Sequence, residues 1–183
     1  NSWAYSYSGI YDFVGSGKAG TGFEYNAAGR VTKSWIGGVY YRYEYPANGG
    51  LYPIKKYGPG TFSETDKGPV TEYTYDSNSR ITNVKPPNMG ALGVTFTYNS
   101  QGRVTQVTNP AGDHEHFVYD GRGNMTSHTD NRDNTWTYTY DDLGRMTSKT
   151  GPGTGNRTTS YTYTGSCSSC GGAAGLIDTV TTP

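Results

Sequence analysis

Five segments of this sequence begin with a tyrosine and repeat nearly the same eight residues: YNAAGRVT at 25–32, YDSNSRIT at 75–82, YNSQGRVT at 98–105, YDGRGNMT at 119–126 and YDDLGRMT at 140–147. Two weaker copies begin at Tyr45 (YPANGGL) and Tyr163. The seven anchor tyrosines are 20, 30, 23, 21, 21 and 23 residues apart. The chain therefore contains a tandem repeat of about 21 residues with insertions.

Each repeat has the pattern of a β-hairpin. Before the anchor, aromatic and polar residues alternate, as in Trp136-Thr137-Tyr138-Thr139-Tyr140, and a period of two is typical of a strand with one face buried. After the anchor, an Asp or Asn followed three residues later by Gly favours a turn. The Arg-apolar-Thr segment then begins the return strand. We predict an all-β fold of tandem antiparallel hairpins that pair edge to edge in a curved or spiralling sheet strip.

The repeated side chains have two possible roles, sugar binding or support of the fold. We favour support, because a residue present in every unit is needed by every unit. We expect mostly buried anchors, with Tyr stacked on Tyr in the next hairpin and Arg bridging to Asp or to a carbonyl. The structural residues of the repeat are Tyr25, Tyr45, Tyr75, Asp76, Arg80, Tyr98, Gly102, Arg103, Tyr119, Asp120, Gly123, Tyr140, Asp141, Gly144 and Arg145.

The composition agrees with a β-structure whose core is rich in tyrosine. Leu, Ile, Val and Phe total only 24 of 183 residues, whereas there are 18 tyrosines and 26 threonines, and Tyr and Thr are strand formers. The formal net charge is zero, which argues against a nucleic-acid partner. No apolar run approaches the ~20 residues that a membrane-spanning helix needs.

The unit Y-D-x-x-G-R-apolar-T resembles the YD repeat of the Rhs family, which includes wall-associated proteins, toxin-complex C-components and teneurins. The match covers roughly residues 23–163 and is specific because five copies agree. The resemblance implies a long β-sheet that winds into a spiral or hollow shell in a secreted or surface protein, and therefore a non-enzymatic extracellular structural role.

Three regions are expected along the chain. They are an N-terminal degenerate repeat at 1–22, the YD-repeat sheet at 23–165 with an insertion at about 51–70, and a Cys/Gly-rich loop with a final strand at 166–183. A shell that encloses cargo needs many hundreds of residues. The partner should therefore be the rest of a larger Rhs-type chain, or identical copies in a self-assembling fibre or sheath.

Cys167 and Cys170 form the only cysteine pair. A C-x-x-C motif suits a redox site, half of a zinc site, a cross-link to another chain or a local disulfide. We favour a local disulfide, because the family resemblance implies an oxidising location outside the cytosol.

His114-Glu115-His116 places two imidazoles on one face of an expected strand, a spacing that metal sites use. A third ligand could come from His128 or Asp113, and the alternative is a pair of solvent-facing histidines. We adopt the alternative and predict no metal and no cofactor. Calcium binding by the carboxylate pairs Asp141–Asp142 or Asp130–Asp133 is a weaker option, because no D-x-D-x-D-G loop is present.

An alternative function is carbohydrate binding or adhesion through exposed aromatic side chains outside the repeat frame. In the strand expected at 39–45, alternation places Tyr40 and Arg42 on one face and Tyr41 and Tyr43 on the other. Tyr40 and Arg42 are the candidate glycan contacts. No G-x-S-x-G or H-E-x-x-H motif occurs, so we predict no catalytic residues and no enzymatic activity.

Overall fold

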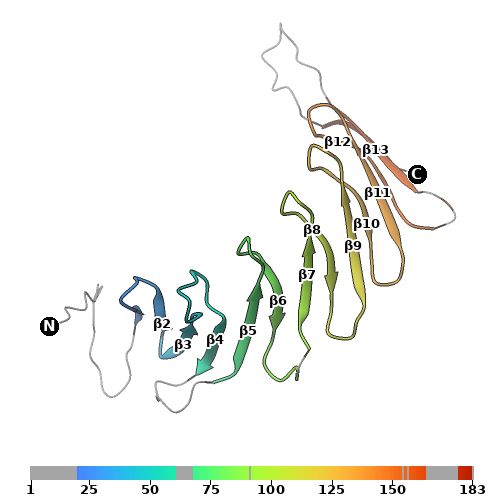
Figure 1. Cartoon of the computed structure of the whole chain (residues 1–183). Coiled ribbons are helices and arrows are strands. Elements are labelled where there is room, and N and C mark those ends of the chain that lie inside the picture. The colour runs from blue at the N-terminus through green and yellow to red at the C-terminus, as the bar shows by residue number, and fades with distance from the viewer. Residues whose placement is uncertain are drawn as a thin grey trace, which may run out of the picture. The chain divides into compact units, whose positions relative to one another are not determined.

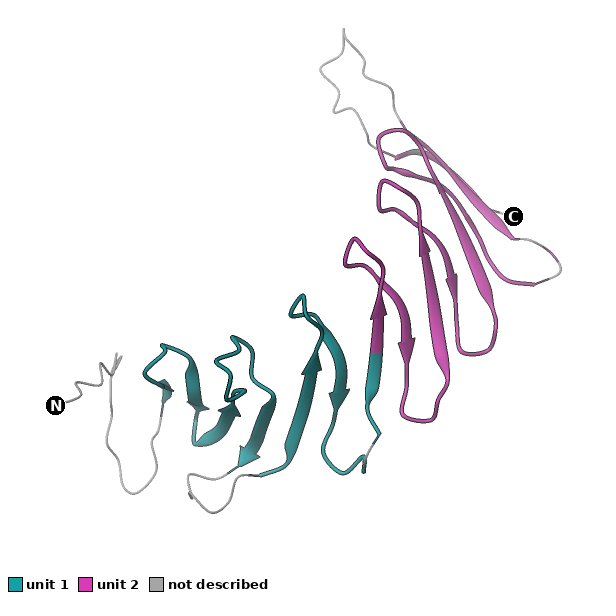
Figure 2. Ribbon diagram, in the orientation of Figure 1, with its two compact units in different colours: residues 1–95 teal, residues 96–183 magenta. Residues whose placement is uncertain are grey.

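The computed structural model describes residues 20–60, 68–90, 92–153, 155, 157–163 and 177–182. The chain divides into two compact units, Asn1–Thr95 and Phe96–Pro183, which Figure 2 shows in teal and magenta. We describe each unit by itself.

Unit 1 contains six strands and the first two residues of a seventh within its described residues (Figure 1). The strands are β1 (Thr21–Tyr25), β2 (Val31–Ile36), β3 (Val39–Glu44), β4 (Lys55–Gly60), β5 (Val70–Tyr75), β6 (Ile81–Lys85) and the start of β7 (Val94–Tyr98). Each strand pairs antiparallel with the next along the chain, from β1 with β2 to β6 with β7. The insertion expected at 51–70 contributes β4, which lies between β3 and β5.

Unit 2 holds the rest of β7 and, among its described residues, seven further strands. They are β8 (Val104–Thr108), β9 (His114–Tyr119), β10 (Met125–Thr129), β11 (Thr135–Tyr140), β12 (Met146–Thr150), β13 (Thr158–Tyr163) and β14 (Ile177–Thr181). Successive strands from β8 to β14 pair antiparallel.

The strands therefore follow one another in the sheet in the order of the chain. The predicted all-β fold of tandem antiparallel hairpins is confirmed. The described residues include no helix, and hence no helix long and apolar enough to cross a membrane.

The hairpins are closed by a recurrent five-residue turn. In the turn at 141–145, the Gly144 N–H donates to the Asp141 carbonyl at 3.0 Å, and the Asp141 N–H donates to the Arg145 carbonyl at 2.9 Å. The strand register shifts between Thr139 and Tyr140, at the foot of the turn. This is the three-residue hairpin loop that ends in a left-handed residue and a bulge. The same backbone hydrogen bonds close the turns at 26–30, 76–80, 99–103, 109–113, 120–124 and 130–134.

Each unit is a single layer in its described part, and burial is correspondingly shallow. Only Trp35 and Tyr40 fall below one-tenth exposure among the described residues, at 4% and 3%. The expectation of mostly buried anchors holds for those from Tyr45 to Tyr163, which have most of their surface covered although none is fully buried, and fails for Tyr25, which is 46% exposed. Without a second layer, a ring is covered only by neighbours in its own sheet.

Two of the turns place a residue other than glycine in the left-handed region, Ser79 with φ 63° and Asp133 with φ 62°. A side chain with a Cβ costs about 1–2 kcal/mol in that conformation, whereas glycine adopts it without a steric penalty. We expect Ser79→Gly to raise the free energy of unfolding by about 1 kcal/mol, after allowing for the greater freedom of glycine in the unfolded chain. Urea denaturation followed by circular dichroism measures the change.

Ser77→Gly is the matched control, because Ser77 is exposed in the same turn and is not among the residues with positive φ. It should be neutral or destabilising. Equal stabilisation by Ser77→Gly and Ser79→Gly would contradict the strain argument.

Candidate functional site

In the five full repeats, the Asp or Asn after the anchor tyrosine holds the turn together with its side chain. The Asp141 Oδ1 accepts the backbone N–H groups of Leu143 and Arg145 at 3.0 and 2.9 Å. The Asp141 Oδ2 accepts the Arg145 Nε at 2.7 Å. The repeat of Asp76 and Arg80 has the same geometry. Arg therefore bridges to Asp within one turn, as the sequence suggested.

These hydrogen bonds stabilise the charged form of the carboxylates. The Arg145 side chain, followed by the Arg145 backbone N–H, lowers the pKa of Asp141. The Arg80 backbone N–H, with its side chain adding to the effect, lowers the pKa of Asp76. In the turns at 120–124 and 130–134 an asparagine amide replaces the arginine and is the main cause that lowers the pKa of Asp120 and Asp130.

The hydroxyl of the anchor tyrosine reaches back to the preceding hairpin. The Tyr140 hydroxyl donates to the Met125 carbonyl at 2.8 Å, and the Tyr163 hydroxyl donates to the Met146 carbonyl at 2.6 Å. Each acceptor is the apolar residue that opens the preceding return strand, beside the bulge where the ladder is interrupted. Burial raises the pKa of Tyr140, so the hydroxyl stays protonated and can donate. In unit 1, two anchor hydroxyls also donate to a carbonyl of the preceding hairpin: Tyr45 to the Val31 carbonyl and Tyr75 to the Pro53 carbonyl.

The repeat arginine covers the ring of the next anchor. The guanidinium carbon of Arg145 lies 4.5 Å from the ring centroid of Tyr163, and that of Arg103 lies 5.8 Å from that of Tyr119. Arg30 lies 4.7 Å from the Tyr45 ring centroid in the same way. The expected stacking of anchor on anchor is thus replaced here by arginine on tyrosine, a cation–π contact.

Gly123 has a second role in this arrangement beyond its φ of 99°. A Cβ built on Gly123 would overlap the Arg103 guanidinium. The glycine therefore leaves room for the arginine of the preceding repeat. At this junction the turn, the arginine and the Tyr119 ring form one chain of contacts from one hairpin to the next.

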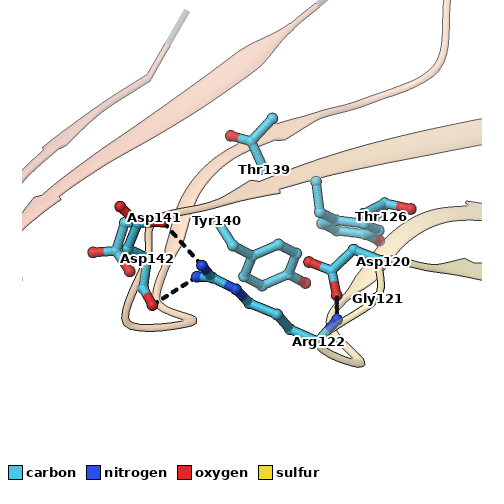
Figure 3. Close-up of a pocket in the computed structure, with 9 residues that line it drawn as sticks. Asp120, Gly121, Arg122, Thr126, Thr139, Tyr140, Asp141 and Asp142 are labelled. Atoms are coloured by element: carbon cyan, nitrogen blue, oxygen red, sulfur yellow. Dashed lines mark hydrogen bonds and ion pairs between the residues drawn. The ribbon is translucent and has the colours of Figure 1, made fainter.

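An open pocket of about 460 Å³ lies between two successive turns of unit 2. Figure 3 shows Arg122 reaching from its own turn to Asp142 on the following one. The Arg122 Nη1 donates to the Asp142 carbonyl at 2.7 Å, and the Nη2 lies 3.2 Å from the Asp142 Oδ1, with the two side chains 61% and 98% exposed. So exposed an ion pair stabilises little. The pocket is a gap bridged between turns rather than a site built for a ligand.

The candidate glycan contacts, Tyr40 and Arg42, are less exposed than the sequence led us to expect. Tyr40 is 3% exposed, because its ring stacks on Trp35 with centroids 6.0 Å apart. Arg42, on the same face, is half-buried. The expectation of an exposed ring at Tyr40 is wrong, since this face carries the most buried pair of unit 1.

The three histidines do not meet. His114 and His116 are exposed on one face of β9. His128 lies on the other face, where its Nε2 is 2.9 Å from the Glu115 Oε2 and its ring stacks between Phe117 and Trp136 at 4.9 and 5.4 Å. The described residues contain no group of three or more His, Cys, Asp or Glu side chains placed to hold a metal ion.

Two hairpin turns carry their cap without an anchor tyrosine. Asp130, considered above as a calcium ligand, accepts the backbone N–H groups of Arg132 and Asn134 through Oδ1. Asn109 does the same for Ala111 and Asp113. The sequence signal that could have predicted these two turns is an Asp or Asn four residues before another polar residue, as in Asn109 with Asp113 and Asp130 with Asn134. Cys167 and Cys170 lie outside the described residues, as does most of 1–22.

Comparisons with known proteins give one family by sequence and similar solved structures by fold. The sequence model of the teneurin YD-shell family matches residues 9–169. No curated protein matches significantly. The crystal structure of TcdB2-TccC3-TEV superposes with a TM-score of 0.66 at 11% identity, over 89% of this chain and 9% of that one. The Photorhabdus luminescens Tc holotoxin pore, carrying the TccC3-D651A mutation, gives a TM-score of 0.62 at 11% identity, over 84% and 8%. The chain spans less than a tenth of the length of either.

We expect Tyr140→Phe to lower the free energy of unfolding by about 1 kcal/mol, because it removes the donor to the Met125 carbonyl and leaves that carbonyl without this partner. Tyr138→Phe is the matched control. Tyr138 is half-buried on the same strand, and its hydroxyl has no hydrogen-bond partner among the described residues. Chemical denaturation of both variants tests the contact, and equal losses would refute it.

Stability should fall in acid because the folded state lowers the pKa of the turn aspartates. A carboxylate with a lowered folded pKa contributes stability that is complete above its unfolded pKa of about 4 and is lost as the pH falls through the folded pKa. We expect the melting temperature to drop between about pH 5 and pH 2.

Replacing Asp76, Asp120, Asp130 and Asp141 together by Asn should flatten this decline, since Asn already caps the turns at 26–30, 99–103 and 109–113. Part of the decline should remain, because Lys85 also lowers the pKa of Glu72. An unchanged acid profile in the fourfold variant would show that the turns are not responsible.

Proposed function

Because this chain belongs to the teneurin YD-shell family, we propose that it forms part of the wall of a larger Rhs-type β-shell, as a non-enzymatic segment acting outside the cell or at its surface. The observation that carries the proposal is the contact from each hairpin to the next, in which Tyr140 and Tyr163 donate to the backbone of the preceding repeat. Such contacts extend a sheet from one repeat to the next.

The geometry suits a wall for a physical reason. A single-layer repeat sheet gains its stability from neighbouring repeats rather than from a closed core. The outermost described strands, β1 and β14, pair on one side only, and unpaired edges are templates for further strands. More repeats of the same chain would cover these edges and add the tyrosine and arginine contacts at each junction.

This sequence covers only a small part of the matched chains, which supports a larger parent chain as the partner. The matched Tc structures contain chains of which this sequence covers 8–9%. An extracellular location is proposed from the family, whose members are secreted or surface proteins. Glycan contact at Tyr40 is left out of the proposal, because that ring is covered by Trp35.

We expect the isolated 183-residue chain not to behave as a free 20 kDa monomer. Its zero net charge offers little repulsion against association, and edge strands favour pairing. Static light scattering at micromolar concentration should show larger species. A folded, heat-resistant monomer would contradict the need for neighbouring repeats.

The association should depend on the edge of the sheet. Val180→Lys on the outermost described strand β14 should reduce it, because a lysine on an edge strand opposes edge-to-edge pairing. Val118→Lys is the matched control, since both valines are about half exposed, at 51% and 54%, but Val118 lies on the interior strand β9. Negative-stain microscopy separates the two forms of partner: filaments or tubes would indicate self-assembly of copies, and closed hollow particles of the parent protein would indicate a shell.

A further inference from the structure

Strand β9 presents two imidazoles to solvent on the same face. His114 and His116 are both exposed, and their ring centroids lie 4.9 Å apart with the planes at 76°. Alternation along the strand directs residues two apart to the same side. The fold has no evident need for either ring, because both lie outside the repeat contacts described above.

A contact with the Gly112 carbonyl determines which ring nitrogen of His114 is free to bind a ligand. Its Nδ1 lies 3.3 Å from the Gly112 carbonyl oxygen. A carbonyl oxygen only accepts, so the Nδ1 carries the proton in this contact and the Nε2 keeps its lone pair. A hydrogen bond from the second ring nitrogen to a carbonyl is the usual support for a metal-binding histidine.

The residues opposite the pair in the strand ladder carry no charge. In the strand register, His114 lies opposite Thr108, and His116 lies between Gln106 on β8 and Thr129 on β10. The nearby carboxylate of Glu115 is on the other face, engaged with His128. The two imidazoles therefore face a neutral, hydroxyl- and amide-lined surface.

We propose that His114 and His116 bind a late divalent transition-metal ion, with copper(II) held most tightly and water completing its coordination. Imidazole suits copper, nickel and zinc, and copper(II) forms the most stable complexes of the divalent series. Copper(II) also accepts the tetragonal geometry that two nitrogens and water oxygens supply. His116 is exposed, and an exposed side chain changes rotamer within nanoseconds, so the His116 ring can turn a nitrogen toward an ion held by the His114 Nε2. Calcium and magnesium prefer oxygen ligands and should not compete.

Copper(II) titration followed by electron paramagnetic resonance tests the site. The wild-type chain should bind one copper ion with hyperfine structure from two imidazole nitrogens. His114→Ala and His116→Ala should each remove one nitrogen from the signal. The double variant should lower the apparent affinity by at least about tenfold, because both protein ligands are lost. Circular dichroism should show all three variants folded, since both side chains are exposed.

His128→Phe is the matched control, because it removes the third imidazole while keeping a ring between Phe117 and Trp136. It should leave copper binding unchanged. A two-nitrogen signal that persists in the double variant would overturn the proposal, as would an equal loss of affinity in His128→Phe. A hundredfold excess of calcium should leave the copper signal in place, and displacement by calcium would show that the ligands are oxygens.

Discussion

The hydrogen bond from an anchor tyrosine to the backbone of the preceding hairpin, made by Tyr45, Tyr75, Tyr140 and Tyr163, is the contact on which these junctions depend. The Tyr140 hydroxyl meets the Met125 carbonyl beside a bulge, where the ladder between the strands is interrupted. In three junctions the arginine of the preceding repeat also covers the anchor ring, as Arg145 covers Tyr163. The aspartate of the same turn holds that arginine. The anchor tyrosine and, through its arginine, the turn aspartate of the repeat thus contribute to the junction with a neighbouring hairpin.

The two faces of unit 2 differ because the repeat has one ring-bearing side and one hydroxyl-bearing side. Phe117, His128 and Trp136 stack in a row across three strands on one face. On the other face, hydroxyls pair across strands, as Thr129 does with Thr135 and Thr150 with Thr158 at 2.9 Å. Neither face is covered by a second layer in the described residues, so even the aromatic row stays half-buried. A wall made of one layer must take its stability along the sheet, from repeat to repeat.

A single-layer sheet of this kind is better suited to form a wall than to enclose a ligand in a pocket. The space between the turns at Arg122 and Asp142 is open and bridged by an exposed ion pair, and the most buried rings, Trp35 and Tyr40, cover one another. The histidine pair on β9 is different, because its side chains are exposed and take no part in the junctions. Surface features of that kind can vary while the repeat stays intact.

The sequence by itself determined the hairpins, their antiparallel order and the turns, because alternation and the Asx-x-x-Gly signal are local and recur in every unit. It also led to the Asp–Arg bridge, since the two residues are only four apart. Tertiary structure alone decided the ring partners: arginine over the anchor rings of Tyr45, Tyr119 and Tyr163, Trp35 over Tyr40, and His128 on the face opposite His114 and His116. Those outcomes depend on strand register and on the lack of a covering layer. The residues of one hairpin do not encode the strand register or the lack of a covering layer, because both depend on how neighbouring hairpins pack.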